Sequence, residues 1–122
     1  MVISNIYLSE CEKSWLEHMF KNDFLYRDEI INQINHSTIK HIRLKNLISI
    51  IFLTDRRVLP INIQNRVPIE MRVYKKSKPP MQFLLHVING YLDELEVFYA
   101  DSSYIEGEFK ILDNDHIEII FN

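Results

Sequence analysis

One dipeptide, Asn89-Gly90, constrains the fold of this chain more than any other feature of its sequence. Asn-Gly is the pair best suited to a two-residue type I′ turn, in which both central residues take positive φ. Residues typical of β-strands are common on both sides of it, so the sequence predicts an antiparallel hairpin of Met81–Ile88 against Tyr91–Tyr99. The rest of the chain must fold around this long hairpin.

A two-residue turn also fixes a predicted register for the hairpin, in which His86 lies opposite Asp93. In that register both faces of the hairpin are largely apolar. A sheet covered on one side alternates more cleanly, so we expect a central hairpin with helices on one face and a partial cover on the other. The predicted faces are Leu84, Ile88, Leu95, Val97 and Tyr99 on one side, and Phe83, Leu85, Val87, Leu92 and Phe98 with Glu94 and Glu96 on the other.

The length and composition predict a single domain over residues 1–122. At 122 residues the chain is long enough for its own core, and 47% hydrophobic with 25% charged residues is ordinary for a globular protein. The longest apolar run, Leu47–Leu53, is far shorter than the roughly 20 residues that span a bilayer. Cys11 is the single cysteine, which excludes an intrachain disulfide and fits a reducing compartment. We therefore expect a cytoplasmic protein.

The charges are sorted along the chain, although the net charge is only −3. Residues 1–37 carry three basic and six acidic side chains, residues 38–80 carry ten and two, and residues 81–122 carry one and nine. Two interpretations stay open at this point. Basic and acidic strands pair and cancel across the sheet, or a patch of one sign steers a charged partner.

The periodicity of apolar residues changes from helical to extended along the chain. Ser9 and Glu12 form a capping-box pattern before a predicted helix over residues 10–21, and a stripe of isoleucines predicts a second helix over Arg27–Asn35. From Thr38 the period is two, which predicts strands. The predicted strands are residues 38–45, Leu47–Thr54, a short or edge strand Val58–Ile63, Ile69–Tyr74, the central hairpin, and a small last hairpin of Glu108–Leu112 with His116–Phe121.

The predicted fold is therefore α+β, with two N-terminal helices packed on a mostly antiparallel, hairpin-rich sheet of about five to seven strands. No residue pattern predicts a metal or cofactor site. Cys11 and His18 lie seven residues apart on a helix, about 10 Å along its axis, which is too far to share one zinc. The two glycines of the chain exclude a dinucleotide fingerprint or a phosphate loop.

Glu94 and Glu96 are the carboxylates most suggestive of catalysis. Neighbours on one strand face lie about 6.5–7 Å apart, which overlaps the separation in inverting glycosidases. That chemistry needs carboxylates facing each other across a cleft, whereas these two point in the same direction. His86 opposite Asp93 lacks a nucleophile in a suitable context. We predict no catalytic residue.

Nucleic-acid binding is a further alternative, because basic residues of the segment 40–78 could follow a phosphate backbone with Tyr74 as a stacking platform. The isoelectric point of about 5.9 argues against it. The basic residues are Lys40, Arg43, Lys45, Arg56, Arg57, Arg72, Lys75, Lys76 and Lys78.

Several short motifs resemble a family of small uncharacterised bacterial proteins. These motifs are Val67-Pro68-Ile69-Glu70, Leu84-Leu85-His86-Val87, Gly90-Tyr91-Leu92-Asp93-Glu94-Leu95-Glu96 and Ala100-Asp101. In Phe24-Leu25-Tyr26-Arg27-Asp28-Glu29 the family pattern has Phe-Pro-Gly before Arg-Asp, and this chain departs from it at Leu25 and Tyr26. The resemblance supports the fold boundaries and implies no activity. Small proteins of this kind are similar in size and build to the immunity partners of bacterial toxins.

Three classes of function remain: a non-catalytic interaction protein such as an immunity-type partner, a small-ligand-binding protein or enzyme, and a nucleic-acid-binding protein. The first class needs only a stable sheet and a charged face, both of which the sequence offers, so it is the predicted function. An acidic face would attract a basic partner protein. The candidate partner-binding residues are Glu94, Glu96, Asp101, Glu106 and Glu108.

Overall fold

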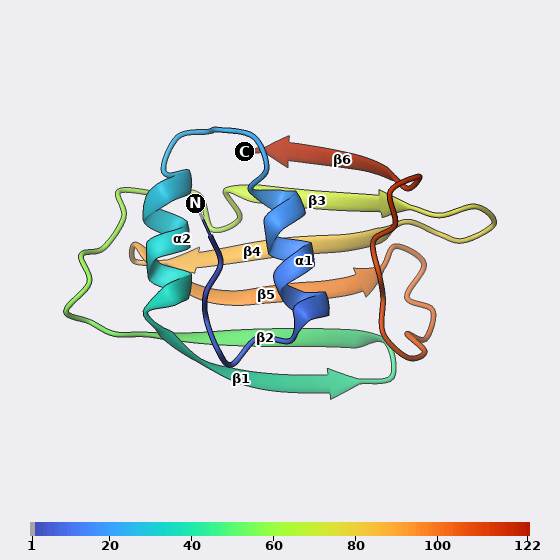
Figure 1. The fold of residues 1–122 in the computed structure, drawn as a ribbon, viewed down its shortest axis with the longest axis horizontal. Coiled ribbons are helices and arrows are strands. Elements are labelled where there is room, and N and C mark those ends of the chain that lie inside the picture. The colour runs from blue at the N-terminus through green and yellow to red at the C-terminus, as the bar shows by residue number, and fades with distance from the viewer. Residues whose placement is uncertain (1) are drawn as a thin grey trace.

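The computed structural model describes residues 2–122, which form two helices and one six-stranded antiparallel sheet (Figure 1). The predicted α+β fold is confirmed. The helices are α1 (Glu10–Met19) and α2 (Arg27–Asn35), and no helix in the described part of the chain is long and apolar enough to cross a membrane. The strands are β1 (Ser37–Leu44), β2 (Leu47–Thr54), β3 (Ile69–Tyr74), β4 (Met81–Ile88), β5 (Tyr91–Tyr99) and β6 (His116–Phe121).

The strand order β1-β2-β5-β4-β3-β6 places the β4–β5 hairpin at the centre, as predicted. Both helices lie on the same face of the sheet (Figure 1). We call this the covered face, and the opposite side the uncovered face, because no second layer of the described residues packs on it. The expected partial cover is therefore wrong, and the reason lies in the register of the hairpin.

The register of β4 and β5 differs from the predicted one beyond the turn. Val87 pairs with Leu92 as predicted, but His86 pairs with Glu94, so Asp93 is an extra residue in a β-bulge. The bulge turns Leu92, Leu95 and Val97 to the covered face, whereas a regular strand would turn Leu92 away from the other two. The predicted pairing of His86 with Asp93 is wrong for this reason.

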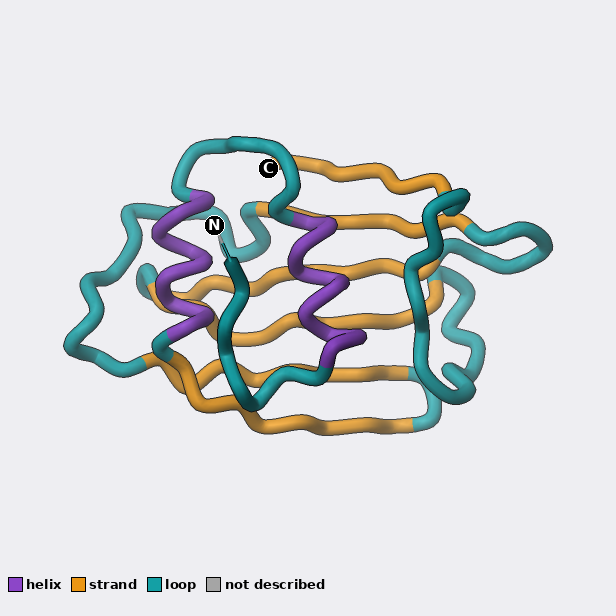
Figure 2. The backbone as a smooth tube through the Cα atoms, in the orientation of Figure 1, coloured by secondary structure: helices purple, strands orange, loops and turns teal. Residues whose placement is uncertain are grey.

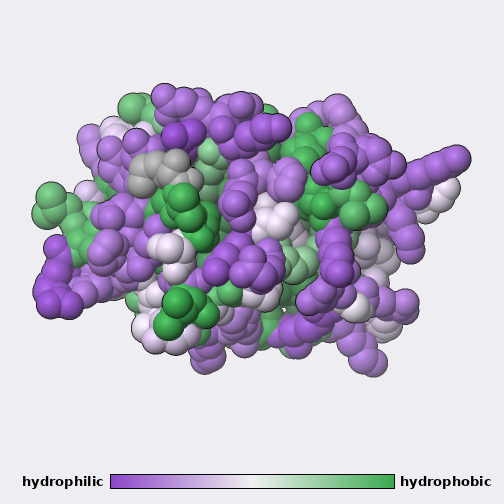
Figure 3. Space-filling model, viewed as in Figure 1, coloured by the Kyte–Doolittle hydropathy of each residue, from purple (hydrophilic) through white to green (hydrophobic). Residues whose placement is uncertain are grey.

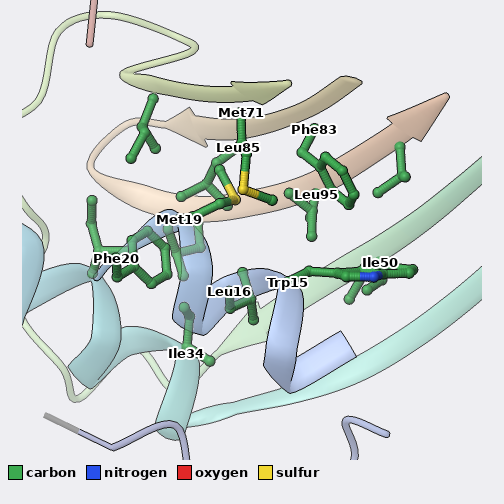
Figure 4. Packing of buried hydrophobic residues seen from close by; sticks show 14 of the residues in the cluster. Trp15, Leu16, Met19, Phe20, Ile34, Ile50, Met71, Phe83, Leu85 and Leu95 are labelled. Atoms are coloured by element: carbon green, nitrogen blue, oxygen red, sulfur yellow. The ribbon is translucent and has the colours of Figure 1, made fainter. Parts of the chain in front are cut away.

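The core fills the space between the helices and the covered face (Figure 4). Trp15 and Met19 of α1 extend towards the sheet, and the ring of Trp15 meets that of Phe83 edge-on at 5.4 Å between centroids. Phe83 and Leu95 are fully buried. Viewed from the helix side, the surface of the molecule is mostly hydrophilic (Figure 3). The helices therefore turn an apolar side to the sheet and a mostly polar side outward.

The two helices begin in different ways. α1 has a complete capping box, because Ser9 accepts from the Glu12 N–H while the Glu12 carboxylate accepts from the Ser9 N–H. α2 begins after Tyr26, whose φ of 70° is strained for a bulky residue and whose side chain makes no cap hydrogen bond. Glycine would adopt this positive φ without strain, whereas tyrosine does not.

The loops gather at the two ends of the sheet, and two of them were predicted as strands (Figure 2). Residues 58–63 form no strand, although the Ile61 N–H donates to the Gly90 carbonyl at 2.8 Å. Residues 108–112 also form no strand, because the Phe109 carbonyl accepts from Trp15 Nε1 at 2.7 Å and Cys11 Sγ at 3.0 Å. β6 therefore pairs with β3 instead of closing a small hairpin.

The turn of the central hairpin has the predicted geometry, with φ values of 51° at Asn89 and 80° at Gly90. A Cβ at Gly90 would lie 2.6 Å from the Ile61 carbonyl oxygen, so only glycine fits there without a shift. Gln33 of α2 is fully buried beside this turn. Its amide donates to the Gly90 carbonyl at 3.0 Å and accepts from the Leu92 N–H at 3.0 Å, which ties α2 to the hairpin.

Candidate functional site

The uncovered face of the sheet is the candidate functional surface. It presents hydroxyl, imidazole and carboxylate side chains that are not needed to pack the core. Alternation along each strand sends every second side chain to this face. On β4 and β5 these side chains are half-buried, in contrast to their fully buried neighbours. The strand residues that define the centre of the face are Ser49, Gln82, Leu84, His86, Glu94, Glu96 and Phe98.

Two carboxylates at the centre are held by diagonal hydrogen bonds from the neighbouring strands. Ser49 of β2 donates its hydroxyl proton to Glu94, and Nε2 of His86 on β4 lies 2.8 Å from the Glu96 carboxylate. Arg66, in the loop before β3, donates from Nε to Nδ1 of His86 at 3.2 Å. A guanidinium can only donate, so Nδ1 accepts, and Nε2 carries the proton donated to Glu96.

This network extends at one end to Asp93. The Arg66 guanidinium lies 3.6 Å from the Asp93 carboxylate, so one arginine contacts both the imidazole and the bulge residue. The bulge thus brings Asp93 within reach of the network without placing it opposite His86. Glu94 and Glu96 keep unused acceptor positions, since a carboxylate accepts up to about four hydrogen bonds.

An apolar strip borders the acidic centre on one side. Its side chains come from β1 and β2, where Ile42 pairs with Ser49 and Leu44 with Leu47. Leu44 is 55% exposed and Leu53 is 59% exposed, although both lie on regular strands. The members of this strip are Ile42, Leu44, Leu47, Ile51 and Leu53.

Charges of the basic and acidic segments cancel only in part. Arg72 pairs with Glu118 at 3.0 Å, and Lys75 pairs with the largely buried Asp115. On the strands of the uncovered face, four carboxylates stand against two cations. The carboxylates are Glu70, Glu94, Glu96 and Glu118, and the cations are Lys40 and Arg72.

The five predicted partner-binding residues do not form one patch. Glu94 and Glu96 lie side by side on the uncovered face. Asp101 lies in the turn after β5, where hydrogen bonds from the Ser103 side chain and backbone lower its pKa. Glu106 and Glu108 are exposed in the loop that crosses towards α1, and Glu108 lines a hollow with Cys11. Only Glu94 and Glu96 therefore lie on one shared surface.

The geometry of the uncovered face does not assemble a catalytic relay. Ser49 donates to the Glu94 carboxylate and not to His86, so the serine, histidine and acid do not form a Ser–His–acid relay. The five hollows described on the surface lie elsewhere, and none is lined by Ser49, His86, Glu94 or Glu96. Cys11 is also a poor nucleophile, because burial and the carboxylates of Glu108 and Glu12 raise its pKa.

The basic residues of the segment 40–78 are divided among three corners of the molecule. Lys40 and Arg43 lie on edge strand β1, Arg56 lies in the loop after β2, and Lys76 lies in the projecting β3–β4 loop (Figure 1). Arg43 donates to the carbonyl of Gly107 at 2.6 Å, and the Arg56 guanidinium lies 3.8 Å from the centre of the Tyr91 ring. No continuous track for a phosphate backbone results. Among residues 2–122, no three histidine, cysteine or acidic side chains are placed to hold a metal ion.

Sequence reasoning missed two members of the network, Ser49 and Arg66. Ser49 interrupts an apolar strand, and a polar residue at such a position signals a side chain that needs a hydrogen-bond partner. Arg66 gave no such signal, since a loop side chain reaches the sheet only through the path of its backbone. Comparisons with protein-family models, with curated proteins and with solved structures found no match.

Proposed function

We propose that this protein is a non-catalytic interaction module that binds a basic partner protein through the uncovered face of its sheet. The observation that carries the proposal is the pair Glu94 and Glu96, held side by side at the centre of a flat face and bordered by exposed leucines. Fixed carboxylates beside an apolar strip suit a partner that presents lysines or arginines next to apolar anchors.

The size of the face suits a protein partner. Six strands about 4.8 Å apart and about eight residues long give a surface of roughly 24 Å by 27 Å, or about 650 Å². One side of a standard protein–protein interface buries about 800 Å². Ile42, Leu44 and Leu53 add exposed apolar surface to this face, and apolar patches rimmed by polar residues mark interaction sites.

An immunity-type role is the form of this function that we favour. A toxin that acts on nucleic acid is typically basic, and an acidic inhibitor associates quickly with a basic enzyme because charge steers the encounter. The half-satisfied carboxylates support this role, since they are ready to accept hydrogen bonds from the partner's side chains without rearrangement.

A photo-cross-linking residue at position 84 on the uncovered face tests the proposal in cells of the native host. The control carries the same residue at position 17, an exposed site on α1. We expect cross-linking from position 84 alone, to one basic protein, and weaker capture when the cross-linking is repeated in cell lysate at rising salt concentration. Equal cross-linking from both positions, or capture of acidic proteins only, would contradict the proposal.

Two charge-reversal variants, one on the uncovered face and one on the helices, test whether position or net charge determines binding. Glu94→Lys/Glu96→Lys changes the net charge by the same amount as Glu17→Lys/Glu29→Lys on the helices. Only the first pair is expected to abolish capture, and circular dichroism checks that both variants fold. If both pairs weaken capture alike, net charge and not the uncovered face determines binding.

A further inference from the structure

A hollow lies on the helix side of the molecule, where α2 begins near the end of β6 (Figure 1). Its volume is about 290 Å³, close to the lower limit of about 300 Å³ for small-molecule sites. Phe24, Tyr26 and Phe121 contribute aromatic rings to its wall, and the rings of Phe24 and Phe121 lie 5.0 Å apart. The hollow is distinct from the uncovered face, which lies on the other side of the sheet.

The side chains that line the hollow are all uncharged. None of the eleven lining residues has a charged side chain, although a quarter of the chain is charged. Polar groups come from carboxamides, chiefly those of Asn62, Gln64 and Asn65, which are exposed at the rim. Such a lining favours a neutral ligand, because an ion would lose hydration without gaining a charged side chain of the lining. The Glu70 carboxylate next to it already accepts from the Asn122 amide at 2.9 Å.

The rim amides have free hydrogen-bonding capacity. Gln64 donates to Asn62 at 3.3 Å, and this is the only hydrogen bond described for the three side-chain amides. A carboxamide offers two donor hydrogens and one acceptor oxygen. Several such groups above an aromatic wall match a flat ring whose edge carries both a donor and an acceptor.

Tyr26 gives independent support for a ring-binding site. Its backbone has φ 70° and ψ 10°, a conformation that strains a bulky residue, and its side chain does not cap α2. Tyr26 therefore stabilises the start of α2 neither through its backbone conformation nor through a capping hydrogen bond. What it adds is an aromatic ring at the wall of the hollow, partly buried against the core.

We propose that this hollow binds a small, uncharged nitrogen heteroaromatic molecule. Its ring lies against Tyr26, Phe24 and Phe121, and its polar edge bonds to the amides of Asn62, Gln64 and Asn65. The volume admits one or two fused rings and excludes a nucleotide with its phosphates. This site is separate from partner binding at Glu94 and Glu96, so either function stands without the other.

Titration of the ¹⁵N-labelled full chain with nicotinamide tests the proposal, and nicotinate is the charged probe with the same ring and similar size, in which a carboxylate replaces the carboxamide. We expect saturating shifts at residues 24–26, 62–65 and 121–122, with nicotinate binding at least tenfold more weakly. Cyclohexanecarboxamide, which has the amide without the aromatic ring, is expected to cause no saturable shift. Equal binding of nicotinate, or shifts that do not saturate, would overturn the inference.

Two variants distinguish a loss of ligand binding from a loss of folding. Tyr26→Gly removes the ring, and relief of the positive φ offsets part of the lost packing, so the protein should stay folded while nicotinamide affinity falls at least tenfold. Gln64→Glu places a charge on the exposed rim and should weaken binding with no change in folding. Unchanged affinity in both variants overturns the site. N-acetyl-tryptophanamide distinguishes the source of the ring, since tighter binding of this peptide-like probe would mean that the hollow takes a partner's side chain instead.

Discussion

The two faces of the β4–β5 hairpin are made by the same two strands and differ in nearly every physical property. On the covered face, Phe83, Leu85, Leu95 and Val97 have no exposed surface. On the uncovered face, Leu84, His86 and Glu96 are half-buried, and His86 bonds to Glu96 in a polar network. Burial of apolar area stabilises the first face. The second contributes less to folding, and its residue types are therefore available for binding.

The bulge at Asp93 determines which residues belong to each face, so deleting the bulge residue and deleting a residue of the regular strand after it should have opposite outcomes. Deleting Asp93 gives a regular ladder that keeps Leu92, Leu95 and Val97 on the covered face, and we expect a folded protein. Deleting Glu96 forces Leu95 or Val97 to the uncovered face, and we expect the fold to be lost. Dispersion of amide signals in a ¹H–¹⁵N spectrum measures both. A folded Glu96 deletion would show that the faces are not fixed by this register.

Truncating one leucine on each face measures the difference directly. Leu95→Ala should lower the free energy of unfolding by about 2–5 kcal/mol, because it leaves a cavity in a packed core. Leu84→Ala should cost on the order of 1 kcal/mol, since water already reaches that side chain. Urea denaturation gives both values. Similar losses would mean that the uncovered face is as important for folding as the covered one.

The turn that precedes the bulge should also be sensitive to substitution. Gly90→Val should destabilise the protein by at least about 1 kcal/mol, because a β-branched residue is strained at positive φ. Contact of the new Cβ with the Ile61 carbonyl and Pro60 adds to this cost. Gly107→Ala is the control, with φ 63° but open space around the Cβ, and should cost less. An unchanged denaturation midpoint for Gly90→Val would exclude the type I′ turn.

A smaller loss of stability is expected at acid pH, because protonation weakens ionic contacts such as Lys75–Asp115 and leaves the apolar covered face unchanged. Burial alone would raise the pKa of Asp115, but hydrogen bonds from Lys75 and the Leu112 N–H outweigh it and lower this pKa below 3.8. The carboxylate therefore stabilises the fold above pH 3.8, and that stabilisation is lost as pH falls through the lower folded pKa. Asp115→Asn should flatten this part of a melting-temperature profile. A profile as steep as that of the unaltered protein would assign the acid sensitivity to other groups.

The elements with strong local signals could be predicted from the sequence. The Asn89-Gly90 turn, the isoleucine stripe of α2 and the apolar run of β2 gave ranges that match the structure. The bulge could not be predicted from turn length, although the spacing of Leu92, Leu95 and Val97 breaks strict alternation and is its signature. Residues 58–63 and 108–112 have strand-like composition, but tertiary contacts use their backbone groups in other ways.

The candidate site was predictable only in its acidic centre. Glu94 and Glu96 share a face because they are two residues apart on a strand, which sequence alone shows. Their partners were not predictable, since the His86–Glu96 contact depends on the shifted register and Arg66 arrives from a distant loop. The hollow beside Tyr26 depends on a positive φ at a tyrosine, which residue type argues against.

The buried amide of Gln33 has a kinetic consequence for the hairpin. Hairpin turns usually exchange their amide hydrogens by local fraying, but here the Leu92 amide is held by a side chain from α2. The turn cannot open without breaking that contact, so its end of the sheet and α2 form one cooperative unit. Leu92 should therefore exchange with deuterium as slowly as the α2 backbone, and Gln33→Ala should return the turn to local opening while the far ends of β4 and β5 stay protected.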